Sequence, residues 1–391
     1  MNPALVIYLK EVRESLRDKR VLLNALLLGP LLGPLLFVVI LRITIGTELD
    51  QAEKPLPVVV IGAQYAPNLL DALQQQGLVV RPPVKDIEAA VRDQRVQLAL
   101  RISDSFSDDW SAGRPAQVEI IFDSSRRDNG GQVERLRGML SYFSRRTSAM
   151  RLVARGVAPS VGTPLMVADR DQATAQARGA LLFAMLPYFL ILTSFIGGMW
   201  LAIDSTAGER ERQSLEPLLA NPVPRGQILL GKLFAAASFS FISLTLGLMA
   251  FAVAARFLPT QKLQMSLDLG PKVIVTILPI MIPLVLLIVV TQMVVSAFAK
   301  TYREAQTYLG LLQLLPVIPS ILLSVMPVTP QLWMYSIPLI GQQLAVMHML
   351  RGEDMAAGPL MLCTVTTFVA LGLMFLFARR IYESERLAVN A

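Results

Sequence analysis

The chain has 391 residues, of which 53% are hydrophobic and only 17% are charged, and its mean hydropathy is +0.52. An average soluble domain is about 45–50% apolar and about 25% charged. The apolar excess excludes a disordered chain and an ordinary cytosolic enzyme. One cysteine, Cys363, and one histidine, His348, exclude a disulfide framework and a multi-histidine metal centre. We therefore expect a membrane part and a sizeable water-facing part.

The formal net charge of +7 raises the question of a nucleic-acid partner. Residues 46–178 carry 17 Lys and Arg against 16 Asp and Glu, so this hydrophilic block is nearly neutral. Most of the positive excess therefore lies at the edges of apolar segments, where it sets orientation in a bilayer. We expect a lipid bilayer as partner and no nucleic acid.

The first apolar segment follows a basic start. Residues 1–20 are expected to form a cytoplasmic amphipathic helix on the inner membrane surface. Residues 21–45 are expected to form the first transmembrane helix, because residues 21–41 contain no charge and about 20 apolar residues cross a bilayer. The segment is too long for a cleaved signal peptide and lacks a small-residue cleavage site.

Residues 46–178 alternate strand-like and helix-like pieces. Short β-branched runs such as residues 57–61 and 117–122 indicate strands, and helical spacing marks residues 68–76 and 86–95. This alternation predicts an α/β domain. The topology below places it outside the cytoplasm, and the absence of histidine and cysteine gives no sign of catalysis.

Residues 179–391 are expected to hold transmembrane helices 2–6. Five long stretches there lack Asp, Glu, Lys and Arg, at residues 179–203, 233–255, 273–299, 305–325 and 359–378. Residues 327–350 are broken by three prolines and fit an external re-entrant hairpin, with a seventh span as the alternative. Six spans with both termini cytoplasmic give the inside-positive distribution of Lys and Arg, so we favour six.

A short charged loop follows the second span, at residues 204–228. Its charges alternate in sign over residues 209–212, and Leu215, Leu218 and Leu219 then recur at helical spacing. An amphipathic helix in this place lies on the membrane surface, docks into a partner's groove or is a solvated connector.

This loop resembles the signature of the ATP-binding-cassette type-2 transporter permease family. Residues 208–222 read GERERQSLEPLLANP: a Glu-rich entry, a Ser-Leu-Glu-x-Leu-Leu helix and a proline. Gln213 and Ser214 stand where the family usually has Gly-Thr, and Pro217 interrupts the helix. The layout of one span, a large α/β block and five further spans also matches, most like the sodium-efflux NatB-like permeases.

The resemblance implies a permease subunit of an exporter, without enzymatic activity of its own. A separate ATPase subunit would bind ATP and magnesium, and a second permease copy would complete a homodimer or heterodimer. It also implies a multi-pass protein of the plasma membrane, typically the bacterial inner membrane, with the α/β domain in the periplasm or outside. The exported substrate would be sodium ions.

The resemblance makes the loop a coupling helix that sits in a cleft of the ATPase. In that cleft, the leucines would supply buried apolar area, and the charged side chains would supply specificity. The expected contacts are Glu209, Glu211, Ser214, Leu215, Glu216, Leu218 and Leu219. The stretch 226–232 matches G-x4-G-K but lacks the following Ser or Thr, so we expect no nucleotide binding there.

Polar residues inside the later spans are candidates for a transport pathway. They are Gln292, Ser296, Thr307 and Gln313, and the alternative role for each is hydrogen bonding between helices. We expect no catalytic residue and no metal site. Exporters of a lipophilic drug, lipid or peptide remain alternatives, as does a membrane-anchored sensor or assembly factor with a ligand-binding external domain.

Overall fold

A computed structural model describes residues 2–125, 129–162, 165, 168, 170–214, 217, 222–258, 269–325, 329–353 and 355–383. The chain forms two compact units, one made of residues 1–45 and 172–391 (unit 1) and one made of residues 46–171 (unit 2). Leu215, Glu216, Leu218 and Leu219 of the loop lie outside the described residues, whereas Pro217 is described.

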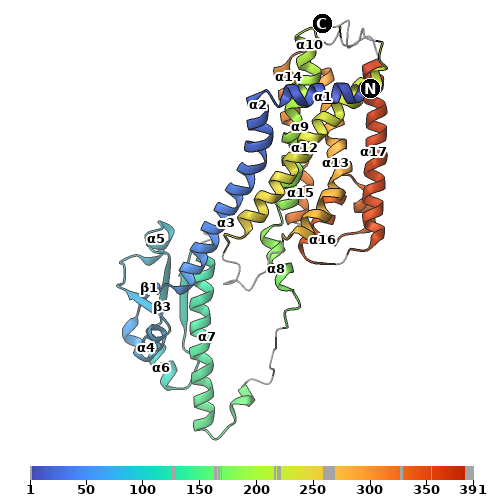
Figure 1. The fold of residues 1–391 in the computed structure, drawn as a ribbon. Coiled ribbons are helices and arrows are strands. Elements are labelled where there is room, and N and C mark those ends of the chain that lie inside the picture. Colours follow the sequence, from blue (N-terminus) through green and yellow to red (C-terminus); the bar gives the residue numbers. More distant parts are fainter. Residues whose placement is uncertain are drawn as a thin grey trace. The chain divides into compact units, whose positions relative to one another are not determined.

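Unit 1 is built from helices (Figure 1). Its N-terminal helices are α1 (Pro3–Ser15), α2 (Lys19–Leu22), the π-helix η1 (Leu23–Leu28) and α3 (Gly29–Glu53), which continues into unit 2. The helices that follow unit 2 are α8 (Ala175–Leu182), α9 (Leu186–Ile203), the π-helix η4 (Asp204–Gly208), α10 (Glu209–Glu211), α12 (Arg225–Ala255), α13 (Pro271–Phe298), α14 (Tyr302–Leu312), α15 (Val317–Val325), the 3-10 helix η6 (Leu332–Ser336), α16 (Ile340–Leu350) and α17 (Ala357–Glu383).

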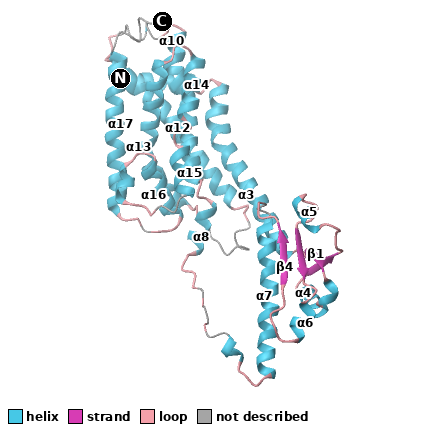
Figure 2. Ribbon diagram, turned by 180° about the vertical axis from the view of Figure 1, so that it is seen from behind, coloured by secondary structure: helices cyan, strands magenta, loops and turns pink. Residues whose placement is uncertain are grey.

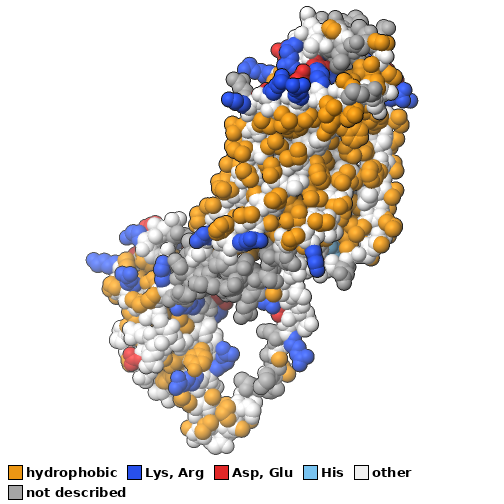
Figure 3. Space-filling model, viewed as in Figure 1, with side chains coloured by type: hydrophobic (Ala, Val, Ile, Leu, Met, Phe, Trp, Pro, Cys, Tyr) orange, Lys and Arg blue, Asp and Glu red, His pale blue; other side chains and the backbone are white. Residues whose placement is uncertain are grey.

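In the part of the chain that the structure describes, six helical stretches are long and apolar enough to cross a membrane, which agrees with the predicted number by length and composition. They are Leu23–Gly46, Leu186–Glu211, Arg225–Ala255, Pro271–Phe298, Tyr302–Leu323 and Ala357–Glu383. Hydrophobic side chains cover the flank of unit 1, and charged side chains gather at the end that carries α1 and α10 (Figure 3). In the segment predicted to be re-entrant, α16 has 11 residues and spans about 16 Å, too short to cross a core of about 30 Å alone.

Helices α9 and α12 approach closely in the centre of unit 1. A Cβ atom placed on Gly197 would lie 2.4 Å from the Ser243 Cβ, so glycine is required for this approach. The Ser243 hydroxyl donates to the Thr193 carbonyl at 3.0 Å, and the Ser240 hydroxyl donates to the Ser194 carbonyl. Small residues and hydroxyls are the usual means by which helices associate in an apolar solvent.

Unit 2 is an α/β unit, and it holds the strands of the described chain (Figure 2). Its sheet has the order β2-β1-β3-β4, with β1 (Leu56–Ile61) parallel to β2 (Leu78–Arg81) and β3 (Leu98–Ile102), and β4 (Val118–Phe122) antiparallel to β3. In the register, Val58 pairs with Val80, and Leu100 pairs with both Val60 and Ile120.

In the described part of unit 2, the α-helices that pack on this sheet are α4 (Pro67–Gln75), α5 (Ile87–Arg92), α6 (Phe106–Ser111) and α7 (Asn129–Ala154). One buried cluster joins the sheet to α4, α6 and α7, and a smaller one joins Val59 and Ala99 to α5. The structure therefore confirms the predicted combination of strands and helices. Residues 172–178, which the sequence assigned to this block, group with unit 1.

Candidate functional site

The candidate site lies in unit 1, where α1, the η4–α10 segment and the first turns of α12 meet (Figure 1). The chain leaves α9 through the five-residue π-helix η4, which forms the first part of the loop at residues 204–228 that the sequence singled out. Wide π-helical turns inside longer helices are found frequently at functional sites. Charged groups from all three segments converge here.

The centre of the site is a buried ion pair. The side chain of Lys232 is fully buried, its ammonium donates to the Ser205 carbonyl at 2.6 Å, and it pairs with the Glu209 carboxylate. The second carboxylate oxygen of Glu209 lies 3.6 Å from the Lys10 Nζ. A buried charge is tolerated only when opposite charges and hydrogen bonds compensate its lost hydration, and Lys232 has both.

Helix α1 contributes a second buried acid to the site. Glu11 is 3% exposed, and its Oε1 lies 3.4 Å from the Lys10 Nζ. Burial raises the pKa of the Glu11 carboxyl; the nearby Lys232 ammonium opposes this rise and the Glu209 carboxylate adds to it. We call Lys10, Glu11, Glu209 and Lys232 the ion network.

Helix α1 is held on α12 by close packing beside the ion network. A Cβ atom on Gly231 would lie 2.7 Å from the Ala4 carbonyl oxygen and 2.8 Å from the Ile7 Cβ, so only glycine permits this contact. The Tyr8 and Ser238 hydroxyls are 3.3 Å apart. These contacts fix α1 in place, so Glu11 stays buried near Glu209 of the loop segment.

The structure places three of the predicted coupling residues. Glu209 is only 6% exposed because its carboxylate compensates the buried Lys232 ammonium, and its contact with an ATPase stays a prediction. Glu211 is exposed and accepts a hydrogen bond from the Tyr302 amide at 2.7 Å. The Ser214 hydroxyl donates to the Glu209 carbonyl at 3.2 Å. The remaining four, Leu215, Glu216, Leu218 and Leu219, lie outside the described residues.

Sequence reasoning missed Lys232. The stretch 226–232 lies in the first turns of α12 and is not a phosphate-binding loop, and its lysine serves the ion network. The available signal was a single lysine on a helix face otherwise formed by Ile228, Leu229 and Ala236, all buried. A charge at such a position needs a partner of opposite charge, and Glu209 lies near the start of the preceding loop.

Two of the four candidate pathway residues lie together. Gln292 and Ser296 are fully buried one turn apart on α13, and the Gln292 amide donates to the Phe195 carbonyl of α9 at 2.7 Å. Among the described atoms, the Gln292 Oε1 and the Ser296 Oγ have no hydrogen-bond partner. Thr307 is exposed and its hydroxyl donates to the Arg303 carbonyl of its own helix, and Gln313 is half-buried at the end of α14.

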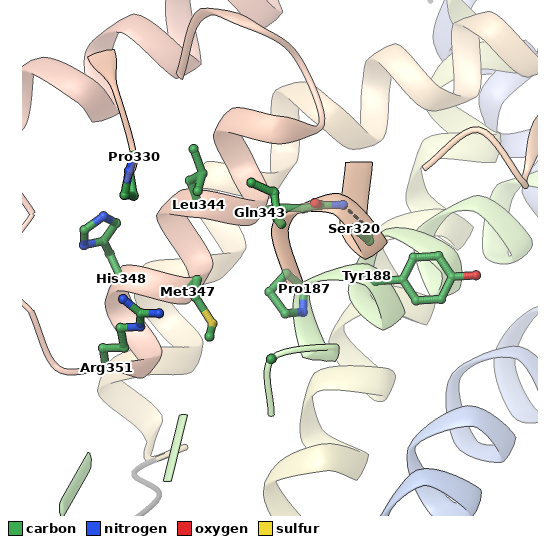
Figure 4. A pocket seen from close by; sticks show the side chains of 11 residues that line it. Pro187, Tyr188, Ser320, Pro330, Gln343, Leu344, Met347, His348 and Arg351 are labelled. Atoms are coloured by element: carbon green, nitrogen blue, oxygen red, sulfur yellow. Dashed lines mark hydrogen bonds between the residues drawn. The ribbon is translucent and has the colours of Figure 1, made fainter. Parts of the chain in front are cut away.

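A small cavity of about 90 Å³ lies among α9, α15 and α16 (Figure 4). The Gln343 amide on its wall donates to the Ser320 Oγ at 2.6 Å, and His348 also faces it. The His348 Nδ1 lies 2.6 Å from the Glu353 Oε2.

In the described part of the chain, no group of three or more His, Cys, Asp or Glu side chains is arranged to hold a metal ion. Six candidate spans, an α/β unit and a charged junction at one end of the helices define a multi-pass membrane protein. Residues 5–376 match the family model described as ABC-2 family transporter protein. The chain therefore belongs to the ABC-2 transporter family, as the loop motif predicted, and is a membrane permease of that family.

One relative is similar to this chain over nearly its whole length. The chain is 25% identical over 385 residues to the ABC transporter permease protein NatB of Bacillus subtilis (strain 168). The alignment covers 97% of this chain and 98% of that protein. The similarity to this permease therefore spans both the candidate transmembrane helices and the α/β unit.

Proposed function

We propose that this chain is the membrane-spanning permease subunit of an ABC exporter, driven by a separate ATPase subunit that binds ATP and magnesium. Family membership supports the permease role. The observation that carries the coupling mechanism is the ion network, which joins the start of the loop to α1 and α12.

The ion network supplies a mechanical link. Separating Glu209 from Lys232 would leave a buried charge uncompensated, which costs about 3–5 kcal/mol. A displacement of the loop by the ATPase therefore moves α1 and α12 with it. Since α12 packs closely on α9 at Gly197, the movement reaches the central helices.

We further propose that the N-terminus, the loop at residues 204–228 and the C-terminus lie in the cytoplasm. The support is the distribution of Lys and Arg: Lys10, Arg13, Arg210 and Arg379 all fall on this side. Unit 2 then lies outside the membrane on the opposite side, in the periplasm of a bacterium with two membranes. A second permease copy completes the pathway.

The coupling loop is tested by changing Leu215 and Leu218 to Asp and measuring co-purification with a co-expressed ABC ATPase subunit. We expect the double variant to lose the ATPase, because charge on the apolar face prevents docking. Leu165→Asp, a change at an exposed leucine of unit 2, should retain it. An intact complex in the double variant contradicts the coupling assignment, and full biological activity without any ATPase would favour the sensor or assembly-factor alternative.

Sodium is the substrate that we propose. Its support is a pair of buried neutral oxygens, Gln292 Oε1 and Ser296 Oγ, for which the described residues provide no hydrogen-bond partner, because hard cations prefer oxygen ligands. The test is ATP-driven sodium flux in proteoliposomes that hold the complex, with Gln292→Leu expected to reduce flux and Thr307→Val expected to leave it unchanged. If the complex transports a lipophilic cation, a lipid or a peptide but no sodium, that class of molecule replaces sodium as the proposed substrate.

A further inference from the structure

Unit 2 contains a groove of about 1000 Å³ between α6 and α7. Its walls come from α6, the segment that leads into β4, and the second half of α7. A volume of this size falls at the upper end of the range for sites that bind one small molecule, about 300–1,000 Å³.

The floor of the groove is apolar and rigid. The Trp110 ring stacks on Phe106 with centroids 5.5 Å apart and on Phe143 with centroids 5.6 Å apart. Leu140 and Leu152 extend this surface along α7. Aromatic side chains of this kind offer a large apolar area with few rotatable bonds.

Arginines line the groove: Arg114, Arg145, Arg151 and Arg155. No Asp or Glu is among the described residues that line it. Arg114 pairs with Asp109 at 2.8 Å, and Arg151 donates to the Trp110 carbonyl at 2.8 Å while its guanidinium carbon lies 4.3 Å above the Trp110 ring. These two arginines therefore hold the groove in shape.

Arg145 and Arg155 have a different position. Both are exposed, and in the described chain no carboxylate lies within ion-pair distance of either. The Arg145 Nε makes a long hydrogen bond of 3.4 Å to the Ser141 carbonyl, and an Arg155 nitrogen lies 3.3 Å from where a Cβ of Gly113 would be. Arg155 thus reaches from the end of α7 to the opposite wall at Gly113.

We propose that this groove binds a small amphiphilic anion, a free molecule with one carboxylate or phosphate group on an apolar body. Guanidinium groups bind carboxylate and phosphate through paired hydrogen bonds, and the aromatic floor accepts the apolar part. The same arginines repel cations, so this site is distinct from any sodium pathway. Arg155, which reaches across to Gly113, binds the anionic group, and Arg145, ten residues earlier on α7, adds positive charge farther along the groove. Phe106, Trp110 and Phe143 contact the apolar body.

The test is calorimetric binding of 6-phenylhexanoate to the full chain in nanodiscs of zwitterionic phosphatidylcholine, with 6-phenylhexanamide as the uncharged control. We expect saturable binding of the carboxylate, weakened by added salt, and binding of the amide at least about tenfold weaker. Arg145→Glu combined with Arg155→Glu should weaken carboxylate binding at least about tenfold. Arg146→Glu, one residue along the same helix but outside the groove lining, should leave it unchanged.

Equal binding of carboxylate and amide, an affinity independent of salt, or unchanged binding in the double variant would overturn the proposal. Binding of an acidic peptide in place of the carboxylate would also overturn it and assign the groove to a protein partner. The salt and amide measurements use the unaltered chain, so they decide the matter even where the double variant folds poorly. None of these outcomes depends on ATP-driven transport, so failure here leaves the exporter proposal intact.

Discussion

The ammonium of Lys232 lies fully buried against the carboxylate of Glu209, 23 residues earlier in the chain. This pair joins α10, at the start of the loop, to the second turn of α12, and Lys10 of α1 lies near the same carboxylate. Three segments that meet only in the folded protein thus share one buried charge network.

Replacing Lys232 by Met should destabilise the protein strongly. The change leaves Glu209 buried without its main partner, which costs about 3–5 kcal/mol. Thermal unfolding in nanodiscs, followed by tryptophan fluorescence, measures the effect. Lys272→Met, at an exposed position at the start of α13, should have little effect.

The double variant Glu209→Gln with Lys232→Met removes both charges and should recover most of the lost stability, because buried ion pairs contribute little net stability. A double variant as unstable as Lys232→Met would show that packing rather than charge explains the loss. ATP hydrolysis by the complex should remain below the wild-type rate even in the stable double variant, because the link to the loop is gone.

Replacing Glu11 by Gln should stabilise the protein at neutral pH. Burial is the largest cause that raises the pKa of Glu11, so the folded protein binds this proton more tightly than the unfolded chain does. The resulting stabilisation is complete below the ordinary pKa of 4.5 and is lost as the pH rises through the raised value. The melting temperature should therefore exceed that of wild type near neutral pH and match it below pH 4.5.

Glu14→Gln, on the exposed side of the same helix, is the matched control for Glu11 and should show no comparable gain. A Glu11→Gln protein that is less stable than wild type at neutral pH would mean that the charged carboxylate is needed by Lys10 and Lys232. The pH profile of the difference separates these two results.

Replacing Gly231 by Val should displace α1 from α12. The first added carbon would already lie 2.7 Å from the Ala4 carbonyl oxygen, closer than atoms can approach. Thermal unfolding in nanodiscs should show a lower midpoint for Gly231→Val than for wild type, because the clash displaces α1. Gly226→Ala, where the nearest atom would be 3.7 Å away, should keep the wild-type midpoint. A wild-type midpoint in Gly231→Val would argue against the close contact.

Cysteine labelling tests the proposed orientation. The single natural cysteine, Cys363, is 1% exposed and should not react with a membrane-impermeant maleimide in the folded protein. In intact cells, Val161→Cys in unit 2 should react, and Arg13→Cys in α1 should react only after the membrane is permeabilised. The reverse labelling pattern would show that the orientation in the membrane is the opposite of the one proposed.

Much of the architecture was predictable because long uncharged stretches and strand-helix alternation are local patterns. The six candidate spans and the strands at residues 56–61 and 118–122 follow from such patterns. The site was less predictable, since the motif marked Glu209 as a surface contact and did not identify its partner. A lysine 23 residues away on a different helix leaves no periodic signal in the sequence.

The sequence by itself determined that this chain enters a membrane, that it carries an α/β unit between its first two spans, and that its loop has the ABC-2 family pattern. These properties depend on hydrophobicity and on neighbouring residues. Only the tertiary structure decided that Glu209 and Glu11 are buried with Lys232, and that Arg145 and Arg155 join an aromatic floor. Each of these groupings brings together side chains from different helices. For Glu11, Glu209 and Lys232, the cost of burying a charge without a partner acts only after those helices have packed.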